Sequence, residues 1–204
     1  MPRAGLTAGL VVDEAARLVD EAGLERLTLS ELAKRFGVAQ PSLYKHVAGL
    51  DDLHGRLAVV AARDLTAALR RAAGGKAGGD ATTAVATAYR RYARRHPGCY
   101  AYLLRPRTGD DDHARASGEL LEVLYDVLAG YGIVTDPDRV DAARFLRSAL
   151  HGFVSPETGG GFAMPNSVER SFERSLQAVD AALRGWPRGV VSQASDDERE
   201  DEDR

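Results

Sequence analysis

Apolar residues recur along this chain three and four positions apart, the spacing that places side chains on one face of an α-helix. The pattern predicts helices over residues 10–22, 50–72, 81–95, 97–104, 120–131, 137–153 and 168–186. The first is expected to bury Leu10, Val11, Ala15, Leu18, Val19 and Ala22. No segment alternates apolar and polar residues in the manner of a β-strand. The sequence therefore predicts an all-α protein.

Two short segments rich in small or polar residues interrupt these helices. Glycines at positions 74, 75, 78 and 79 follow the long helix and mark a domain boundary. We expect a first domain over residues 1–48, a connecting helix over 49–73 and a second helical domain over 80–187. Residues 154–165 include three consecutive glycines and are either a hinge that gates a cavity or a plain connector. Residues 188–204 are expected to be a disordered acidic tail.

A compact motif lies within residues 28–47. Thr28 is a favourable N-cap, and Glu31 follows it at the capping-box spacing, which predicts the start of a helix. Gly37 suits the left-handed geometry that ends a helix. Pro41 fits the first turn of a second helix, where its missing N–H costs nothing. The motif is therefore a helix, a tight turn and a second short helix.

The second helix of this motif has an inner and an outer face. Leu43 and Val47 lie four residues apart and are expected to face the core, with Val38 filling the corner between the helices. The residues left pointing outward are Gln40, Ser42, Tyr44, Lys45 and His46. Glutamine can pair with an adenine edge, while hydroxyl and cationic groups suit phosphates. Ordinary solvated surface residues are the alternative, but the motif favours a helix that enters the DNA major groove.

Residues 7–55 resemble the DNA-binding domain of the TetR family of transcriptional regulators. The resemblance lies in residues 37–47, Gly-Val-Ala-Gln-Pro-Ser-Leu-Tyr-Lys-His-Val, and in residues 22–28, Ala-Gly-Leu-Glu-Arg-Leu-Thr. It implies an N-terminal three-helix helix-turn-helix domain and a C-terminal helical domain for ligand binding and dimerisation. It also implies that the following residues face DNA: Thr28, Ser30, Gln40, Pro41, Ser42, Tyr44 and His46. Lys45 adds a cation for the phosphate backbone.

Two positions depart from the family pattern. Many members have a lysine near the start of the helix that follows the recognition helix, where this chain has Leu50 followed by Asp51 and Asp52. Both carboxylates would repel phosphate unless they turn away. Ser30 stands where some relatives carry a longer basic side chain. These departures change the expected number of contacts to the DNA phosphate backbone. They do not change the expectation that the second helix of the motif enters the major groove.

Charge gives little nonspecific attraction to DNA. The net charge is −3, and residues 1–56 contain seven Lys or Arg against eight Asp or Glu. Attraction must therefore come from the local placement of cations. The candidates are Arg26, Lys34, Arg35 and Lys45. We expect modest nonspecific affinity for each subunit, with contacts doubled by dimerisation.

The remaining composition predicts a cytoplasmic globular protein. Hydrophobic residues make up 44% of the chain and charged residues 28%. No apolar run is long enough to cross a membrane, and the first residues do not read as a signal peptide. The single cysteine, Cys99, excludes an intrachain disulfide and suits a reducing compartment. It is expected to be a buried structural thiol, with a redox sensor as the alternative.

The family resemblance also implies a small-molecule effector in the C-terminal domain and a homodimer through the last two helices, whose apolar faces are wide. Candidate effector-binding residues there are Tyr89, Tyr92, Tyr100, Phe145 and His151. Ordinary core packing is the alternative for each of them. A twofold dimer with two recognition helices would bind an inverted-repeat operator.

Catalysis has little support in the sequence. Residues 110–113, Asp-Asp-Asp-His, contain metal-binding side chains, but consecutive residues cannot all reach one ion, and no second cluster supports them. We find no nucleophile elbow and no phosphate-binding glycine loop, and expect no catalytic residue, metal or cofactor. The prediction is a ligand-responsive regulator, more often a repressor than an activator, that a small molecule releases from double-stranded DNA. The alternatives are a helical ligand-binding protein without operator binding and, less favoured, an enzyme.

Overall fold

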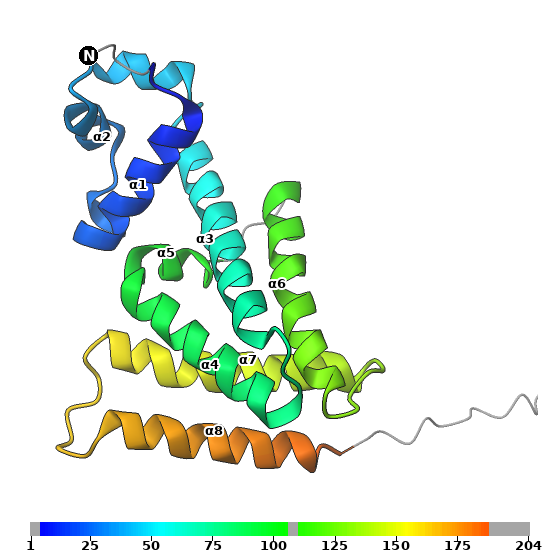
Figure 1. The fold of residues 1–204 in the computed structure, drawn as a ribbon. Helices are drawn as coiled ribbons and strands as arrows, with labels where there is room; N and C mark the ends of the chain where they lie inside the picture. The colour runs from blue at the N-terminus through cyan, green and yellow to red at the C-terminus, as the bar shows by residue number, and fades with distance from the viewer. Residues whose placement is uncertain (1–4, 106–109, 188–204) are drawn as a thin grey trace, which may run out of the picture.

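The computed structural model describes residues 5–105 and 110–187, and all regular structure in these ranges is helical (Figure 1). The α-helices are α1 (Ala8–Ala22), α2 (Leu29–Phe36), α3 (Leu50–Ala73), α4 (Gly78–Arg95), α5 (Pro97–Tyr102), α6 (Asp111–Ala129), α7 (Asp138–Thr158) and α8 (Val168–Arg184). Two short 3-10 helices, η1 (Leu24–Arg26) and η2 (Gln40–Lys45), join the first elements. The all-α prediction is confirmed. The predicted acidic tail lies outside the described residues.

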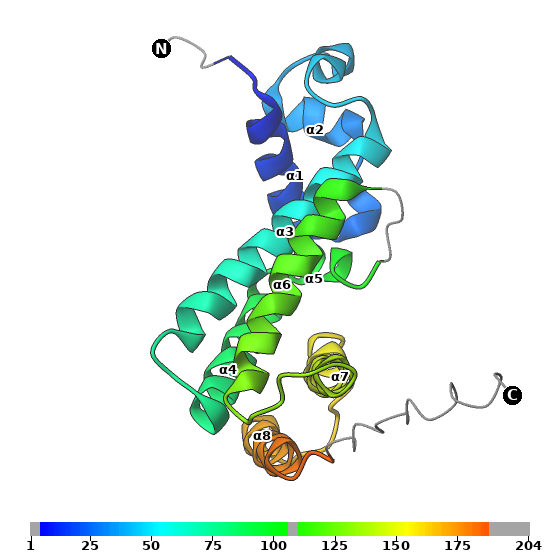
Figure 2. The same ribbon diagram turned by 90° about the vertical axis from the view of Figure 1, so that its right-hand side faces the viewer.

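The long helix α3 connects a small group of helices at the N-terminal end with a larger group beyond it (Figures 1 and 2). Its first half, including Leu53 and Leu57, packs in one apolar core with α1, α2, η2 and α5. Its second half, including Leu65 and Leu69, packs in another core with α4, α6, α7 and α8. All four leucines are fully buried. Movement of α3 therefore affects both cores.

The buried stripe of α1 is shifted from the predicted one. Thr7 caps the helix by accepting a hydrogen bond from the Leu10 backbone N–H at 3.2 Å. Val12 is buried, while Leu10 is 40% exposed and Ala22 is exposed. Residues two apart are separated by about 200° around an α-helix, so Leu10 and Val12 cannot share a narrow face. The prediction was wrong for Leu10 and Ala22.

The glycine-rich segment forms less of a break than predicted. Only residues 74–77 separate α3 from α4, because Gly78 and Gly79 already belong to α4. A Cβ on Gly79 would lie 2.6 Å from the Asp180 carboxylate of α8, and one on Gly78 would lie 3.6 Å from the Gly130 carbonyl oxygen. Glycine thus lets the start of α4 pack closely against the ends of α6 and α8.

The segment between the last two helices is also shorter than predicted. Helix α7 continues through Thr158 and includes Pro156 in its last turn, so only residues 159–167 form the connector. The Gly161 backbone N–H donates to the Pro156 carbonyl oxygen at 2.7 Å and closes the helix end. The Phe162 ring packs on Phe153, with ring centres 5.0 Å apart. No residue of the connector lines the cavity described below, which favours the plain connector.

A buried arginine joins α4 to α7 and to the start of α8. Arg90 donates through Nε and Nη2 to the two oxygens of Glu157, at 2.7 Å each. Its Nη1 donates to Glu169 at 2.7 Å, and its guanidinium lies 4.4 Å from the centre of the Phe172 ring. The Arg90 side chain is 8% exposed and that of Glu157 is 13% exposed. The positive charge of Arg90 is therefore paired with carboxylates of α7 and α8, the two antiparallel helices that α4 faces.

Candidate DNA-binding surface and ligand cavity

The first helix of the predicted motif forms as its sequence indicates. Thr28 has extended backbone geometry, and its Oγ1 accepts a hydrogen bond from the Glu31 backbone N–H at 3.1 Å. Gly37 ends α2 with φ of 65° and ψ of 34°, the left-handed geometry that glycine adopts without strain. The cap occupies an acceptor position on Thr28 and leaves its hydroxyl hydrogen available to an outside partner.

The second element of the motif is a 3-10 helix rather than the predicted α-helix. Within η2 and at its end, the backbone N–H groups bond three residues back, from Ser42 to Ala39 at 2.9 Å and from His46 to Leu43 at 2.9 Å. Pro41 has no N–H, and a six-residue segment forms few of the i to i−4 bonds that stabilise an α-helix. The short length and the proline together favour the tighter helix.

Leu43 and Val47 anchor this element in the N-terminal core. Both are buried, as predicted. The prediction for Val38 was wrong, because its side chain is 37% exposed and does not fill the corner. Gly37 turns the chain so tightly that Val38 already lies beyond the packed corner, with its N–H bonded to the Ala33 carbonyl oxygen at 3.0 Å.

The predicted DNA-facing residues are all at least partly exposed at the N-terminal helices. Tyr44 is 54% exposed, and its hydroxyl has no hydrogen bond within the described residues. Thr28, Ser30, Gln40, Pro41 and Lys45 are also exposed, while Ser42 and His46 are half-buried. We call the following residues the η2 surface: Thr28, Ser30, Gln40, Pro41, Ser42, Tyr44, Lys45 and His46. Its polar groups are a carboxamide, hydroxyls, an imidazole and an ammonium, which are the groups that contact base edges and phosphates.

Ion pairs decide which charges near the η2 surface remain available. Arg35 is held by Glu14 at 3.0 Å and by Glu21 at 2.9 Å, so two carboxylates already compensate its charge. Asp52 accepts from the Ala48 backbone N–H at 2.8 Å and from Arg56 at 2.9 Å, and the Arg56 bond lowers the pKa of Asp52. The Asp52 carboxylate thus serves the start of α3 and does not stand unpaired before a phosphate.

The short helix α5 attaches the N-terminal helices to the rest of the molecule. Asp20 on α1 accepts from the Cys99 backbone N–H at 2.9 Å, and its other oxygen contacts His96 Nδ1 at 2.8 Å. A Cβ on Gly98 would lie 2.1 Å from the Val19 carbonyl oxygen, so only glycine allows this approach. Sequence reasoning missed this joint, although the His-Pro-Gly run at 96–98 marked the turn.

Cys99 lies within this joint and is buried, as predicted for a structural thiol. Its Sγ lies 3.8 Å from the Ala16 carbonyl oxygen. Burial, together with the nearby Asp20 carboxylate, raises the pKa of the Cys99 thiol to about 12. A thiol in this setting stays protonated near neutral pH and is a poor nucleophile.

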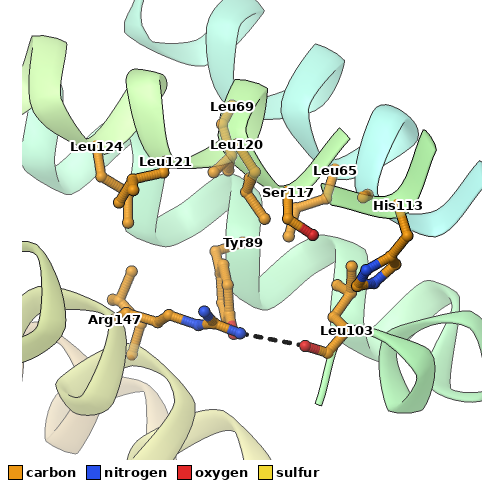
Figure 3. Close-up of a pocket in the computed structure, with 12 residues that line it drawn as sticks. Leu65, Leu69, Tyr89, Leu103, His113, Ser117, Leu120, Leu121, Leu124 and Arg147 are labelled. Carbon is orange, nitrogen blue, oxygen red and sulfur yellow. Dashed lines mark hydrogen bonds between the residues drawn. The ribbon is translucent and has the colours of Figure 1, made fainter. Parts of the chain in front are cut away.

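A cavity opens between α3, α4, α6 and α7 (Figure 3). It has a volume of about 640 Å³ when its open mouth is included, while its inner part, where the centre of a water molecule fits, measures about 60 Å³. The apolar residues of its lining are Ala62, Leu65, Leu69, Leu103, Leu120, Leu121, Leu124 and Leu150. The polar ones are Tyr89, His113, Ser117 and Arg147. An apolar lining with few polar groups is typical of small-molecule sites.

The five predicted effector-binding residues occupy different places. Tyr89 lines the cavity, and its hydroxyl is 3.0 Å from that of Tyr100, which is 2.7 Å from His151 Nδ1. Tyr92 instead donates to the Ala61 carbonyl oxygen at 3.2 Å, and Phe145 packs on Trp186 with ring centres 5.4 Å apart. The structure therefore brings three of the five together and separates two.

Sequence reasoning did not single out the other polar lining residues. Arg147 lies one turn before His151 on α7, and its Nη2 donates to the Leu103 carbonyl oxygen at 3.1 Å. His113 and Ser117 lie four residues apart on α6 and so share a face. This spacing was the available signal, but only tertiary packing shows that both line the cavity.

The acidic run before α6 serves that helix. The Asp110 side chain accepts a hydrogen bond from the His113 backbone N–H at 2.9 Å and caps α6. Within residues 5–105 and 110–187, no group of three or more His, Cys, Asp and Glu side chains is placed to hold a metal ion. No helix in these ranges is long and apolar enough to cross a membrane.

Known proteins share both parts of this architecture. Residues 11–53 match the family model for bacterial regulatory proteins of the tetR family, and residues 82–179 match the model for the tetracyclin repressor-like C-terminal domain. The chain is 36% identical to the uncharacterized HTH-type transcriptional regulator Rv0681 of Mycobacterium tuberculosis (strain ATCC 25618 / H37Rv), over 77% of this chain and 72% of that protein. It is 32% identical to the uncharacterized HTH-type transcriptional regulator YobS of Bacillus subtilis (strain 168), over 89% of this chain and 95% of that protein.

Solved structures show the same fold. The structure of SCO4313 has a TM-score of 0.70 and 26% identity, covering 84% of this chain and 94% of that one. The TetR family protein ActR of Streptomyces coelicolor, in complex with (S)-DNPA, has a TM-score of 0.62 and 17% identity, covering 89% and 98%. The helix-turn-helix, the helical C-terminal domain and these relatives together define a DNA-binding transcriptional regulator. The chain belongs to the TetR family.

Proposed function

We propose that the protein is a homodimeric repressor that binds a palindromic operator through the η2 surface of each subunit and leaves it when a small molecule enters the cavity. It acts in the cytoplasm and without catalysis. The observation that carries the DNA-binding part is the η2 surface, where Gln40, Tyr44 and Lys45 are exposed beside a buried Leu43. A rigidly anchored element with such groups can place an amide against a base edge and a cation against phosphates.

The outer faces of α7 and α8 support a dimer, although for a different reason than predicted. Their large apolar side chains, such as Leu146 and Phe172, are buried within the subunit. What remains exposed includes small residues on both helices, namely Ser148, Gly152 and Ser155 on α7 and Ser171, Ala178 and Ala182 on α8. Small residues let helices approach closely, and the antiparallel pair lies at one side of the molecule (Figure 2). A twofold mate would complete a four-helix bundle.

The dimer can be tested at Gly152, where an added Cβ meets nothing within 4 Å in the subunit. A Gly152→Trp variant should be monomeric in sedimentation velocity, because the indole would hold the mate's helices apart. Gly118 on α6 is likewise exposed and open, so Gly118→Trp is the matched control and should stay dimeric. A dimeric Gly152→Trp variant would contradict the proposed interface.

The cavity supports effector binding. Its apolar lining and few polar groups suit a small molecule, and the ActR complex with (S)-DNPA shows that a protein of this fold takes up a ligand. The inner part is narrow, so an effector would have to widen the gap between α6 and α7. Because α3 lines the cavity and also carries the N-terminal core, such a change would reach the η2 surface.

Selection of bound sequences from a random duplex DNA pool tests the DNA-binding part. The proposal predicts enrichment of an inverted repeat, with half-site centres about 34–36 Å apart in the simplest arrangement. No enrichment at low salt, from a folded helical dimer, would favour the alternative of a helical ligand-binding protein without operator binding.

A further inference from the structure

The charges around the cavity restrict the chemistry of its ligand. None of its twelve lining residues is an aspartate or a glutamate, and Arg147 is the one lining residue with a permanent charge. The Arg147 side chain reaches across the mouth from α7 toward the end of α5 (Figure 3). An organic cation would therefore meet a like charge and no counter-charge, whereas an organic anion would meet its counter-ion.

Arg147 retains donors for such an anion. Within the described residues its side chain donates one hydrogen bond, from Nη2 to the Leu103 carbonyl oxygen, and forms no ion pair. A guanidinium has five N–H donors in a planar fork that matches a carboxylate. A neutral carbonyl is a weaker partner than a carboxylate, so an incoming anion can compete for Nη2 as well.

The groups near Arg147 are suited to complete an anion site. Ser117 adds a hydroxyl donor, and His113 adds an imidazole. Burial, and after it the Arg147 charge, lowers the pKa of His151, whose Nδ1 lies 2.7 Å from the Tyr100 hydroxyl, and so disfavours a second cation beside Arg147. The positive charge at the mouth is thus that of Arg147, and leucines fill most of the remaining lining.

We propose that the effector is an apolar carboxylic acid, whose carboxylate binds Arg147 at the cavity mouth while its hydrocarbon part lies among the leucines. This inference rests on the proposed effector site and names its ligand class. The Arg147 bond to Leu103 gives the carboxylate a route to the N-terminal helices. Leu103 directly follows α5, and α5 holds α1 through Gly98 and Cys99.

Isothermal titration calorimetry with three ligands of equal chain length tests the proposal. Decanoate, 1-decanol and decyltrimethylammonium, each below its micellar concentration, share a tail and differ in head-group charge. Decanoate should bind the wild-type protein about tenfold or more tightly than 1-decanol, the effect expected for a charge-assisted hydrogen bond. The cation should bind weakest. Equal affinity for decanoate and 1-decanol, or no decanoate binding, would overturn the proposal.

Variants locate the effect at one side chain. Arg147→Gln should weaken decanoate binding about tenfold and change 1-decanol binding less than threefold, while Arg147→Lys, which keeps the charge but loses the planar fork, should fall between the wild type and Arg147→Gln. Arg144→Gln is the control, since Arg144 lies on the same helix, points to solvent and pairs with Asp141 at 3.2 Å. Unchanged decanoate binding by a folded Arg147→Gln variant, checked by circular dichroism, would also overturn the proposal.

Operator binding by the unliganded protein separates this inference from the proposed function. If an inverted repeat is enriched but decanoate is not preferred over 1-decanol, the proposed function stands and the carboxylic acid is excluded as the effector. If decanoate is preferred but no operator sequence is enriched, the anion site stands and the proposed function as an operator-binding regulator is refuted. With both present, decanoate should release the operator in a mobility-shift assay, and Arg147→Gln should need about tenfold more of it. Release at the same decanoate concentration would contradict the role of Arg147.

Discussion

The two halves of α3 lie in differently packed surroundings. Around the first half, Leu53 and Leu57 are fully buried among α1, α2 and η2, and the polar groups of the η2 surface all lie outside. Around the second half, Leu65 and Leu69 belong to a core that leaves a cavity between α3, α4, α6 and α7. An element that must hold side chains against DNA needs a filled core behind it. A region that must admit a ligand needs space within it.

Contacts outside α3 also join the N-terminal helices to the rest of the molecule. The closest of these contacts predicts the largest loss of stability on substitution. At Gly98 on α5 a Cβ would overlap the Val19 carbonyl group of α1, which is backbone and cannot turn aside. We expect Gly98→Ala to lower the free energy of unfolding by about 3 kcal/mol. Chemical denaturation followed by circular dichroism measures the change.

Gly118 provides the control for this substitution. It lies inside α6 with nothing within 4 Å of an added Cβ, so Gly118→Ala should stabilise the protein by about 0.5–1 kcal/mol through helix propensity alone. If Gly98→Ala were as stable as Gly118→Ala, the close joint between α1 and α5 would be refuted.

The buried ion pair of the second half predicts a smaller loss. Glu157→Ala leaves Arg90 with only the exposed carboxylate of Glu169, and should cost about 2 kcal/mol, somewhat less than a fully buried pair because Glu157 is 13% exposed. Glu169→Ala removes the partner that is 62% exposed and should cost less than about 1 kcal/mol. Equal losses in thermal or urea unfolding would show that burial does not set the strength of these pairs.

The same pair predicts a dependence on pH. The hydrogen bond from Arg90 lowers the pKa of Glu157 below its ordinary value of 4.5. The pair's contribution is therefore fully present above about pH 4.5 and is lost as the pH falls through the lower, folded-state pKa. Between pH 5 and pH 3 the wild type should lose more stability than Glu157→Gln, which has no carboxyl group to protonate there. Parallel curves would contradict the assignment.

The smallest expected effect concerns Cys99, and it decides between a structural thiol and a redox sensor. With a pKa of about 12, roughly one thiol in ten thousand is ionised at pH 8. The native protein should therefore react with Ellman's reagent far more slowly than the unfolded protein does. A fast native reaction would restore the redox alternative and show that the joint at α5 opens readily.

Much of this fold follows from local signals in the sequence. Thr28 and Gly37 begin and end α2 as their cap chemistry requires, and the three-and-four spacing predicted helices where α3 and α8 lie. Predictions failed where neighbours decide the outcome. Pro41 and the short segment after it produce a 3-10 helix, and Gly78 and Gly79 belong to α4, where they lie against the ends of α6 and α8.

The two candidate sites differ in how far the sequence could define them. The residues of the η2 surface all lie within residues 28–46, so a single motif was enough to propose them. The cavity draws on four helices and on Leu103 after α5, and it joins residues as far apart in the sequence as Leu65 and Arg147. Aromatic residues were predicted to bind the effector, but Phe145 packs on Trp186 and does not line the cavity. No local sequence pattern indicated that Arg147 would lie at the cavity mouth.

Repeating the DNA selection with Gln40→Ala tests the central claim, that the η2 surface reads the operator, most directly. If the Gln40 amide contacts a base edge, the variant should lose its preference at one position in each half-site, at a cost of about 1–3 kcal/mol there, and keep the others. Tyr44→Ala, in contrast, should weaken binding to all sequences alike if its hydroxyl contacts phosphate. Wild-type sequence profiles and affinities for both variants would contradict the account and place DNA recognition elsewhere on the protein.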